Sequence, residues 1–409
     1  MIKSVKIENY KSIQELEVDV GRFNVIIGEN GAGKSNFLEA MALFGAAEAD
    51  KLDNEFLSSR GVRSCIPKKM ISLFEPVNSD NINITLHPTD NKNQYKHTLQ
   101  SSNEAYPKLE KRYRTFSDIA TLDTPLTLES LEELLEVSRK ISLEQDILIK
   151  NYSDDKKTKD LIDLKAKQIH ENLETVKINL LKMKENKFKT QISNFILYSP
   201  ENTALRNFYR EGQIEPLGIN GEGLLKLLKV MQESEAAAFQ DVLNCLELFD
   251  WFETIEVPKD LSSMEDKVSI KDKYLTTLFD QRSANEGFLF VLFYAALFCS
   301  QYTPKIFAID NIDASFNPKL CTVLIKKLVE LAKKYDKQVF VTTHNPAILD
   351  GLDLGDEEQK LFVASRNKQG HTRFKTLTLS DKPKSSTGEP IRLSEAFLRG
   401  YLGGLPKNF

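Results

Sequence analysis

The residues with the clearest chemistry form a glycine-rich run, GENGAGKS, that begins at Gly28. The run fits the pattern GxxxxGK[ST], in which glycines allow a tight turn whose backbone N–H groups point at phosphate oxygens. Lys34 would neutralise the β- and γ-phosphates, and the hydroxyl of Ser35 would bind Mg²⁺. The sequence therefore predicts a site for a nucleoside triphosphate and Mg²⁺, lined by Gly28, Glu29, Asn30, Gly31, Ala32, Gly33, Lys34, Ser35 and Asn36.

Three later segments carry groups that could complete this site. The apolar run KIFAID ends at Asp310, whose carboxylate would hold Mg²⁺ through a water molecule or through Ser35. The turn SANEG, residues 283–287, precedes an apolar helix, and the run VFVTT precedes His344. A buried strand that ends in an acid is common by itself. The order of phosphate loop, helix-opening turn, strand with Asp and strand with His favours a nucleotide site.

Strands and helices must position these groups, and the hydrophobic pattern predicts both. A strand over 23–27 and a helix over 35–44 flank the phosphate loop. Strands are expected over 5–7 and 16–20, and more short strands among Asn- and Asp-rich turns, over 70–74, 82–86 and 95–99, indicate an antiparallel subsheet. Later, helices alternate with buried strands, which predicts the α/β class with a parallel sheet. These elements are helices over 221–249, 287–300 and 318–335, strands over 306–309 and 339–342, a hairpin over 361–379 and a helix over 393–405.

Composition divides the chain into three parts. Residues 1–125 form an N-terminal lobe with the phosphate loop and the subsheet, and residues 191–409 form a C-terminal lobe. Between them, residues 126–190 are rich in Leu, Glu, Lys and Asp and lack Gly, which predicts an inserted helical hairpin or small bundle. Its lysine-rich second half, 156–189, is either a solvated helix face or a surface for nucleic acid or a partner. Residues 380–390 are the best candidate for a flexible linker.

The overall composition is ordinary, with 41% hydrophobic residues, 28% charged residues and a formal net charge of −4 over 409 residues. No stretch approaches the roughly 20 consecutive apolar residues of a membrane span, and the first residues lack the apolar core of a signal peptide. We therefore expect a cytoplasmic protein with no membrane partner. The four cysteines contain no CxxC pair and the five histidines are scattered, which disfavours a zinc site or a disulfide framework.

Taken together, the motifs resemble the ABC-type ATPase heads of the SMC/RecF class. The likeness covers roughly residues 1–50 and 280–350, and IENYKSI, residues 7–13, is similar to the first strand and turn of that family. The resemblance implies an α/β fold, an ABC-type P-loop NTPase head with a mixed β-sheet and an inserted α-helical arm. Such heads sandwich two ATP molecules between two subunits, so a homodimer or higher homo-oligomer is expected.

The resemblance also implies roles for particular residues. Ser283, Glu286 and Gly287 stand where the family signature reaches the γ-phosphate of ATP bound to the opposite subunit. His344 stands at the switch histidine, and residues 313–318 (DASFNP) stand near the loop that crosses the dimer interface.

The chain departs from the family after the magnesium aspartate. Family members usually place Glu there, whereas this chain has Asn311. An amide has no basic oxygen near neutral pH, although it can orient water by hydrogen bonding. We expect ATP and Mg²⁺ binding, with Asp310, Asn311 and His344 at the catalytic positions and with weak or partner-dependent hydrolysis. Asp313, or Glu286 of a second copy, is an alternative base.

The whole chain resembles the compact ABC-type, AAA-family ATPases of bacterial antiphage systems, such as the Septu ATPase, its retron-linked relatives and the PARIS ATPase. The resemblance rests on the SMC-like ends, the short helical insertion, and the segments IDNIDASFNP and TTHNPAILDGLDL. In that family the ATPase controls a separate effector, often an HNH or Toprim nuclease. The resemblance therefore implies that this protein holds or regulates such a nuclease.

Other functions remain as alternatives. An SMC/RecF-like DNA-repair or DNA-clamp ATPase would use the basic residues of 156–189 and of 108–114 (KLEKRYR) for DNA phosphates. A GTPase is disfavoured because the nearest match to NKxD, residues 91–94 (NKNQ), lacks the carboxylate. A self-contained nuclease is disfavoured because the acids of 350–358 are best explained as a solvated turn.

Overall fold

The computed structural model describes residues 1–63, 66–74, 80–89, 94–102, 107–115, 167, 187–207, 215–258, 267–383 and 391–405. It divides into two units, one of residues 1–116 with 191–409 and one of residues 117–190. Apart from 167 and 187–190, the predicted helical insertion of 126–190 lies outside the described residues. So do residues 384–390 of the predicted linker and the side chains of 112–114 in the basic run 108–114. Everything below concerns the first unit.

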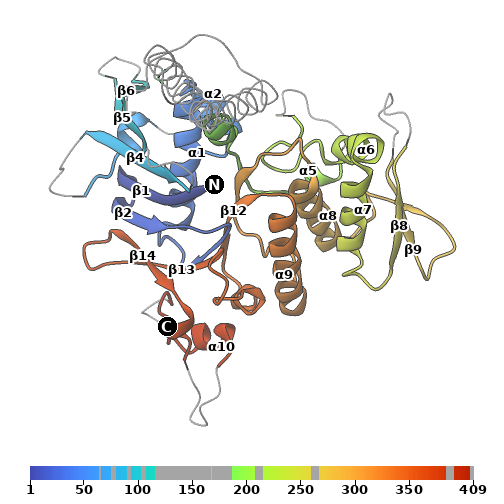
Figure 1. The fold of residues 1–409 in the computed structure, drawn as a ribbon. Coiled ribbons are helices and arrows are strands. Elements are labelled where there is room, and N and C mark those ends of the chain that lie inside the picture. The colour runs from blue at the N-terminus through green and yellow to red at the C-terminus, as the bar shows by residue number, and fades with distance from the viewer. Residues whose placement is uncertain are drawn as a thin grey trace, which may run out of the picture. The chain divides into compact units, whose positions relative to one another are not determined.

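A six-stranded mixed sheet forms the centre of this unit (Figure 1). Its order is β14-β13-β3-β12-β11-β7, and all neighbours pair in parallel except β14, which is antiparallel to β13. The strands are β3 (Phe23–Gly28), β7 (Leu197–Tyr198), β11 (Ile306–Ile309), β12 (Gln338–Thr343), β13 (Gln359–Arg366) and β14 (Thr372–Leu377). β3, β11 and β12 are buried along their whole length, and their sequences are mostly apolar, although β3 holds Asn24 and β12 holds Gln338 and two threonines.

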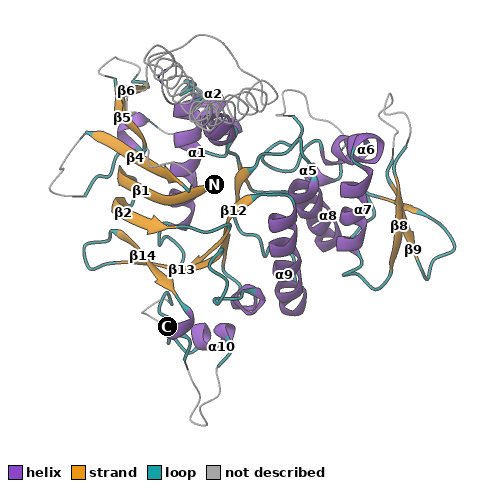
Figure 2. Ribbon diagram, viewed as in Figure 1, coloured by secondary structure: helices purple, strands orange, loops and turns teal. Residues whose placement is uncertain are grey.

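Different helices cover the two faces of this sheet, so alternate side chains of its strands pack against different helices. On one face, the ring of Phe298 lies 6.4 Å from Phe23 and 5.2 Å from Phe307. On the other face, Phe37 lies 6.2 Å from Phe340. The helices are α8 (Glu286–Cys299) and α9 (Pro318–Lys334) on the first face and α1 (Lys34–Glu48) on the second. Figure 2 shows α8 and α9 on the side of β12 opposite the antiparallel sheet. The α/β class is therefore confirmed, with a mixed sheet.

The predicted strands over 82–86 and 95–99 pair in an antiparallel sheet, which is larger than predicted and has five strands in the order β2-β1-β4-β5-β6. Its strands are β1 (Ile2–Tyr10), β2 (Ile13–Asp19), β4 (Asn81–Pro88), β5 (Tyr95–Ser101) and β6 (Leu109–Thr115). The strand predicted over 70–74 is wrong. Residues 67–69 form the 3-10 helix η1 (Pro67–Lys69), and Ile71 makes a single bridge to Tyr10. Met70 and Ile71 are buried there without extending a strand ladder, whereas Leu73 is exposed.

The helix predicted over 221–249 is two helices, α6 (Leu224–Ser234) and α7 (Ala236–Leu246). Glu235 breaks them because its carboxylate accepts hydrogen bonds from Ser300 Oγ at 2.6 Å and Gln301 N at 2.8 Å. A small antiparallel sheet that the sequence analysis missed follows, of β8 (Phe252–Glu256), β9 (Ser269–Asp272) and β10 (Phe279–Asp280). Two further helices are short: α2 (Asn54–Ser59) follows α1, and α5 (Asn202–Leu205) follows β7.

The C-terminal elements are short. They are the 3-10 helices η2 (Pro346–Gly351) and η3 (Leu379–Asp381) and the helix α10 (Leu393–Leu398). The helix predicted over 393–405 ends early because Gly400 has a positive φ of 75° and Gly403 and Gly404 have φ of 79°. Across the described part of the chain, no helix combines the length and apolarity needed to traverse a lipid bilayer.

Candidate nucleotide-binding site

The phosphate loop joins the end of β3 to the start of α1, as the sequence predicts. Gly28, Gly31 and Gly33 have φ of 152°, 76° and 100°, a region that other residues rarely adopt. Space is also restricted, since a Cβ on Gly28 would lie 2.2 Å from the carbonyl oxygen of Ala364. The loop therefore needs glycine both for its turn and for its close approach to β13. It leads into the N-terminus of α1, where free N–H groups favour an anion.

Lys34 lies within this loop. Its side chain is buried, and its Nζ donates hydrogen bonds to the carbonyl oxygens of Gly28 at 2.8 Å and Glu29 at 3.0 Å. Burial lowers the pKa of Lys34, and the charges of Asp310, Asp313 and Glu29 partly oppose this. An anionic phosphate at the loop would further stabilise the ammonium form.

Ser35 and Asp310 come together from opposite ends of the chain. Ser35 Oγ donates to Asp310 Oδ2 at 3.0 Å and lies 3.3 Å from Oδ1. The hydroxyl of Thr342 donates to Oδ1 as well. This meeting follows from the sheet, because β3, β12 and β11 are parallel neighbours and their carboxyl ends share one edge.

The pair of Ser35 and Asp310 suits Mg²⁺, which prefers oxygen ligands and usually binds one or two protein groups, several waters and phosphate oxygens. No cluster of three or more His, Cys, Asp or Glu suited to a metal ion occurs in the described ranges. The hydroxyl and carboxylate near the phosphate loop are thus the groups that fit the ion. The glycine-rich turn and buried lysine fit the triphosphate that would accompany it.

Asn311 adopts a left-handed conformation with φ of 54°. Asn tolerates this region better than most residues because its short side chain can bond locally. Its backbone N–H donates to Thr342 Oγ1 at 2.9 Å. Thr342 therefore links Asp310 and Asn311, and it fixes the direction in which the chain leaves β11.

His344 follows β12 and lies beside Asp313, whose Oδ1 accepts from the His344 N–H at 3.3 Å. Desolvation by neighbouring protein atoms and then the charge of Lys34 lower the pKa of His344, while Asp313 and Asp310 act in the opposite sense. The imidazole is accordingly neutral near pH 7 and has one donor and one acceptor nitrogen.

The SANEG turn behaves differently from the other predicted segments. Asn285 caps α8 by accepting from the N–H of Phe288 at 2.7 Å, and Gly287 lies in the first turn of that helix. A Cβ on Gly287 would lie 3.3 Å from the carbonyl oxygen of Ser315, so the turn packs against 313–318. Within the described ranges, no hydrogen bond or ion pair joins Ser283, Glu286 or Gly287 to the phosphate loop. Within one chain, the described contacts therefore do not bring the SANEG turn to the phosphate loop.

Two charged residues near the loop were missed by sequence reasoning. Glu39 in α1 is buried, its carboxylate accepts from Tyr10 OH at 3.3 Å, and it forms ion pairs with Lys11 and Arg63. Arg63 also donates to Asn36 Oδ1 at 3.3 Å, next to the phosphate loop. Burial lowers the pKa of Arg63, but the hydrogen bond and charge of Glu39, with a smaller effect of Asp310, raise it overall.

The sequence did carry one signal for this cluster. Glu39 is the only charged residue in the apolar run from Phe37 to Phe44, which is unusual for a buried helix face. A buried carboxylate requires a partner, but the sequence does not indicate which cations supply it.

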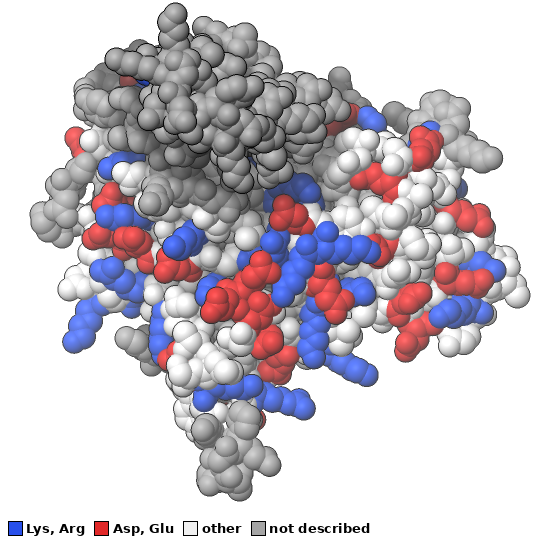
Figure 3. All heavy atoms as spheres, in the orientation of Figure 1, with Lys and Arg blue, Asp and Glu red and all other residues white. Residues whose placement is uncertain are grey.

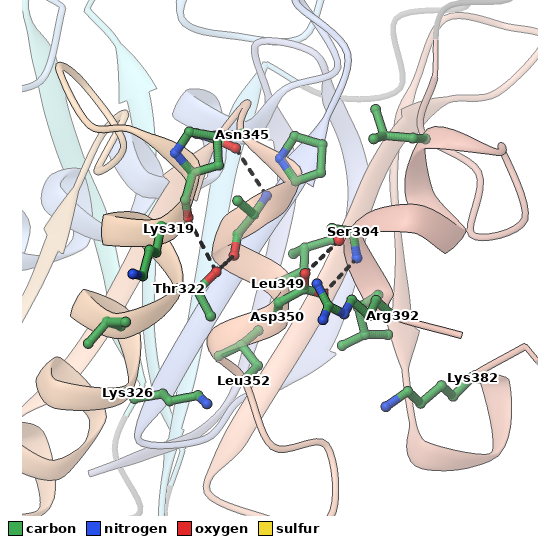
Figure 4. A pocket seen from close by; sticks show the side chains of 16 residues that line it. Lys319, Thr322, Lys326, Asn345, Leu349, Asp350, Leu352, Lys382, Arg392 and Ser394 are labelled. Carbon is green, nitrogen blue, oxygen red and sulfur yellow. Dashed lines mark hydrogen bonds between the residues drawn. The ribbon is translucent and has the colours of Figure 1, made fainter. Parts of the chain in front are cut away.

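A cavity of about 760 Å³ lies elsewhere, between α9, η2 and the segment around α10 (Figure 4). Its floor is apolar, and four cationic residues line it: Lys319, Lys326, Lys382 and Arg392. Among the described residues, no carboxylate lies within ion-pair distance of these four; Asp350 in the wall accepts instead from Ser394 N at 3.0 Å and Ser394 Oγ at 2.6 Å. The lining includes Asn345, the residue after His344.

This chain is similar to known proteins in both sequence and fold. Residues 23–350 match the protein family described as "AAA domain, putative AbiEii toxin, Type IV TA system". A stretch of 49 residues is 45% identical to the uncharacterized protein MJECL10 of Methanocaldococcus jannaschii, and it covers 12% of this chain and 22% of that protein.

In fold, the chain is similar to the SmcHead crystallised with the C-winged helix domain of ScpA, with a TM-score of 0.51, 14% identity, and coverage of 93% of this chain and 98% of that chain. An Smc head bound to the C-terminal domain of ScpA, derived from Pyrococcus furiosus, gives a TM-score of 0.46, 13% identity, and coverage of 93% and 96%. The SMC head domain of Thermotoga maritima gives a TM-score of 0.42 and 14% identity, with coverage of 92% of this chain and 99% of that chain.

The likeness to SmcHead confirms the predicted fold of a P-loop NTPase head with a mixed sheet. Since the family match spans most of the chain, this protein belongs to the AAA family of AbiEii-like ATPase domains.

Proposed function

We propose that this protein binds ATP and Mg²⁺, dimerises around the nucleotide, hydrolyses it slowly, and regulates a separate effector nuclease in antiphage defence. The observation that carries the nucleotide site is the contact of Ser35 with Asp310 beside the buried Lys34. Equilibrium titration with ATP and Mg²⁺ tests it. Lys34→Ala should abolish binding, whereas the exposed Lys3→Ala should bind as wild type does. Equal binding by all three proteins would refute the site.

In this proposal each group has a separate task. The Lys34 ammonium and the loop N–H groups bind the phosphates, and Ser35 with Asp310 supplies the protein oxygens that Mg²⁺ needs. The Asn311 amide can orient a water molecule but cannot accept its proton. The neutral His344 imidazole can hydrogen-bond near the terminal phosphate. Slow hydrolysis follows because no strong base stands directly after Asp310.

Dimerisation explains the position of the SANEG turn. Ser283, Glu286 and Gly287 make no described contact with the phosphate loop of their own chain, and a second copy would place them at its nucleotide. The loop 313–318 packs against Gly287 and also carries Asp313, which contacts His344. Closure of two subunits would therefore act on both segments. Light scattering with and without ATP measures this step.

The proposed control of an effector needs a surface that communicates with the nucleotide site, and the cavity beside α9 supplies one. Lys326 and Lys382 extend from opposite sides of it in the view of Figure 4. Its cationic rim and apolar floor suit an acidic segment with an apolar anchor from the partner protein. Because Asn345 follows His344 directly, an occupant would contact the segment that leaves the nucleotide site.

Co-purification with the product of a neighbouring gene tests the effector proposal. A bound HNH or Toprim nuclease that is released from Lys326→Glu protein but retained by Lys3→Glu protein would support it. The absence of a bound nuclease or toxin with ATP and without it would contradict it. The family name mentions a type IV toxin–antitoxin system, which is a further context in which a partner protein is expected.

The second candidate is a DNA clamp, favoured by the fold shared with the SMC head. The stretch 156–189, which would supply its phosphate contacts, lies mostly outside the described residues. On the face drawn in Figure 3, basic and acidic side chains are interspersed, so the described part of that face has no single-sign field. DNA affinity that needs ATP and falls steeply with log[salt] would favour the clamp, and affinity independent of both would exclude it.

A further inference from the structure

Two side chains of the β13–β14 hairpin hold successive carbonyl groups of the phosphate loop. Arg366, the last residue of β13, donates from Nε to the carbonyl oxygen of Gly31 at 2.7 Å. Thr372, the first residue of β14, donates from Oγ1 to the carbonyl oxygen of Ala32 at 3.0 Å. The contact is close, since a Cβ on Gly33 would lie 2.1 Å from Thr372 Oγ1. The hairpin therefore forms a wall of the loop.

Thr372 also belongs to a chain of hydrogen bonds whose direction can be assigned. Its hydroxyl has one proton, which goes to Ala32, so the hydroxyl of Ser12 at 2.8 Å must be the donor between the two side chains. Ser12 Oγ in turn accepts from Nδ2 of Asn36 at 2.7 Å. The chain thus runs from Asn36 through Ser12 and Thr372 to Ala32. Thr372 is fully buried, so removing its hydroxyl would leave Ser12 and the carbonyl oxygen of Ala32 without this partner and without water to replace it.

These bonds determine where the loop presents its donors. In a trans peptide, the carbonyl and the following N–H point in opposite directions. With the oxygens of Gly31 and Ala32 held by the hairpin, the N–H groups of Ala32 and Gly33 are turned away from it. The N–H of Ala32 accordingly lies 3.3 Å from the carbonyl oxygen of Glu29, within the loop. An N–H that is turned away from the hairpin in this way and has no acceptor within the loop can bind a phosphate oxygen.

We propose that the β13–β14 hairpin is the positioning element of the phosphate loop, and that Arg366 and Thr372 set its affinity for the triphosphate. The inference rests on the proposed nucleotide site and adds residues to it. A loop with three glycines loses much conformational freedom when it binds a ligand. Holding two of its peptides in place beforehand removes part of that cost from binding.

The test compares four variants in ATP titrations and in thermal unfolding without nucleotide. Thr372→Val keeps the shape but removes the hydroxyl, and Thr372→Ser restores the hydroxyl. Arg366→Met removes the donor to Gly31 from an exposed position. The matched control is Arg373→Met on the same hairpin, because Arg373 donates to the carbonyl oxygen of Glu15 at 3.1 Å and not to the loop.

ATP affinity should fall about tenfold in Thr372→Val and in Arg366→Met, the size expected from losing one buried or charged hydrogen bond. Thr372→Ser and Arg373→Met should bind within about twofold of wild type. The Arg366→Met and Arg373→Met proteins should unfold at the same temperature, so that weaker binding cannot be assigned to lost folding. If Thr372→Val fails to fold, the Arg366→Met comparison decides.

Two failures can be told apart. If wild type binds ATP and Lys34→Ala does not, yet Arg366→Met and Thr372→Val bind as wild type does, the positioning role is overturned and the nucleotide site remains. If wild type binds no ATP, the nucleotide site and the positioning role both fall.

Discussion

The hydroxyl of Ser35 lies 3.0 Å from the carboxylate of Asp310, although 275 positions separate the two residues in the sequence. The contact joins the first turn of α1 to the residue that follows β11, and it forms because β3, which precedes α1, lies in the same sheet as β11. Mg²⁺ is expected to bind at this contact, so the first prediction concerns the metal ion.

Asp310→Asn should remove the effect of Mg²⁺ on ATP affinity while leaving metal-free binding close to wild type. The amide keeps the volume but loses the charge that a hard cation requires. ATP titrations with Mg²⁺ and with a chelator measure how much Mg²⁺ raises the ATP affinity. This increase should be at least about tenfold smaller in the variant than in wild type. Asp19→Asn, an exposed change on β2, is the control. A normal Mg²⁺ effect in the variant would place the ion elsewhere.

Asn311→Glu should accelerate ATP hydrolysis by about 10²-fold or more, because a carboxylate at this position can accept a proton that the amide cannot. The left-handed φ of 54° costs a Glu roughly 1–2 kcal/mol, so the variant should also be less stable. Asp tolerates that conformation better than Glu and carries the same charge on a shorter side chain. Asn311→Asp therefore shows whether the charge alone is enough or the length of the side chain also matters. Unchanged turnover in both would mean that the base lies elsewhere, at Asp313 or Glu286 of a second copy.

His344 predicts a pH dependence of stability. The pKa of His344 in the folded protein is below its ordinary value of 6.5, so between the two pKa values the unfolded chain binds more protons. Stability contributed by the neutral imidazole is therefore present above pH 6.5 and is lost as the pH falls below it. Urea unfolding at pH 8 and pH 5.5 should show a larger acid-induced loss for wild type than for His344→Gln. Equal losses would show that His344 is not desolvated.

Gly287→Arg should prevent ATP-dependent dimerisation but not ATP binding. A Cβ at this position already lies 3.3 Å from Ser315, and a long side chain would fill the surface offered to a second copy. Light scattering follows the dimer, and titration follows binding. Gly355→Arg is the matched control, since a Cβ there meets only the side chain of Asp353 within 4 Å. A Gly287→Arg dimer that still forms with ATP would rule out the assignment of the signature turn.

Glu39→Ala should lower the free energy of unfolding by about 3–5 kcal/mol, because it leaves Lys11 without its buried partner. Arg63→Ala should cost less than about 1 kcal/mol, since its side chain is 67% exposed. It should nevertheless weaken ATP binding, because Arg63 holds Asn36 beside the phosphate loop. Denaturant unfolding and ATP titration of both variants separate the two effects. Similar stability losses would mean that Arg63 is mainly structural.

Much of the fold could be predicted because the central strands are mostly apolar and the phosphate loop marks the start of α1. Lys34, Ser35, Asp310 and His344 could be grouped because a parallel sheet brings the carboxyl ends of its strands to one edge. The break between α6 and α7 could not be predicted, because it depends on contacts of Glu235 with Ser300 and Gln301, far away in sequence.

The hairpin contacts were unpredictable for a related reason. Arg366 and Thr372 look like ordinary exposed and strand residues in the sequence, and their importance comes from the pairing of β13 with β3. The ion pair of Glu39 with Arg63 likewise depends on how a loop folds back over α1. Local pattern identifies which elements form, whereas these side-chain partners come from tertiary packing.

The neighbours of β3 in the sheet also bear on biosynthesis. Both strands that flank β3, β12 and β13, are synthesised more than three hundred codons after it. A nascent chain on the ribosome therefore carries its phosphate loop without these neighbours until β12 and β13 have been translated. A ribosome that stalls before β13 would release a chain in which one edge of β3 is unpaired and the phosphate loop lacks its contacts with Arg366 and Thr372.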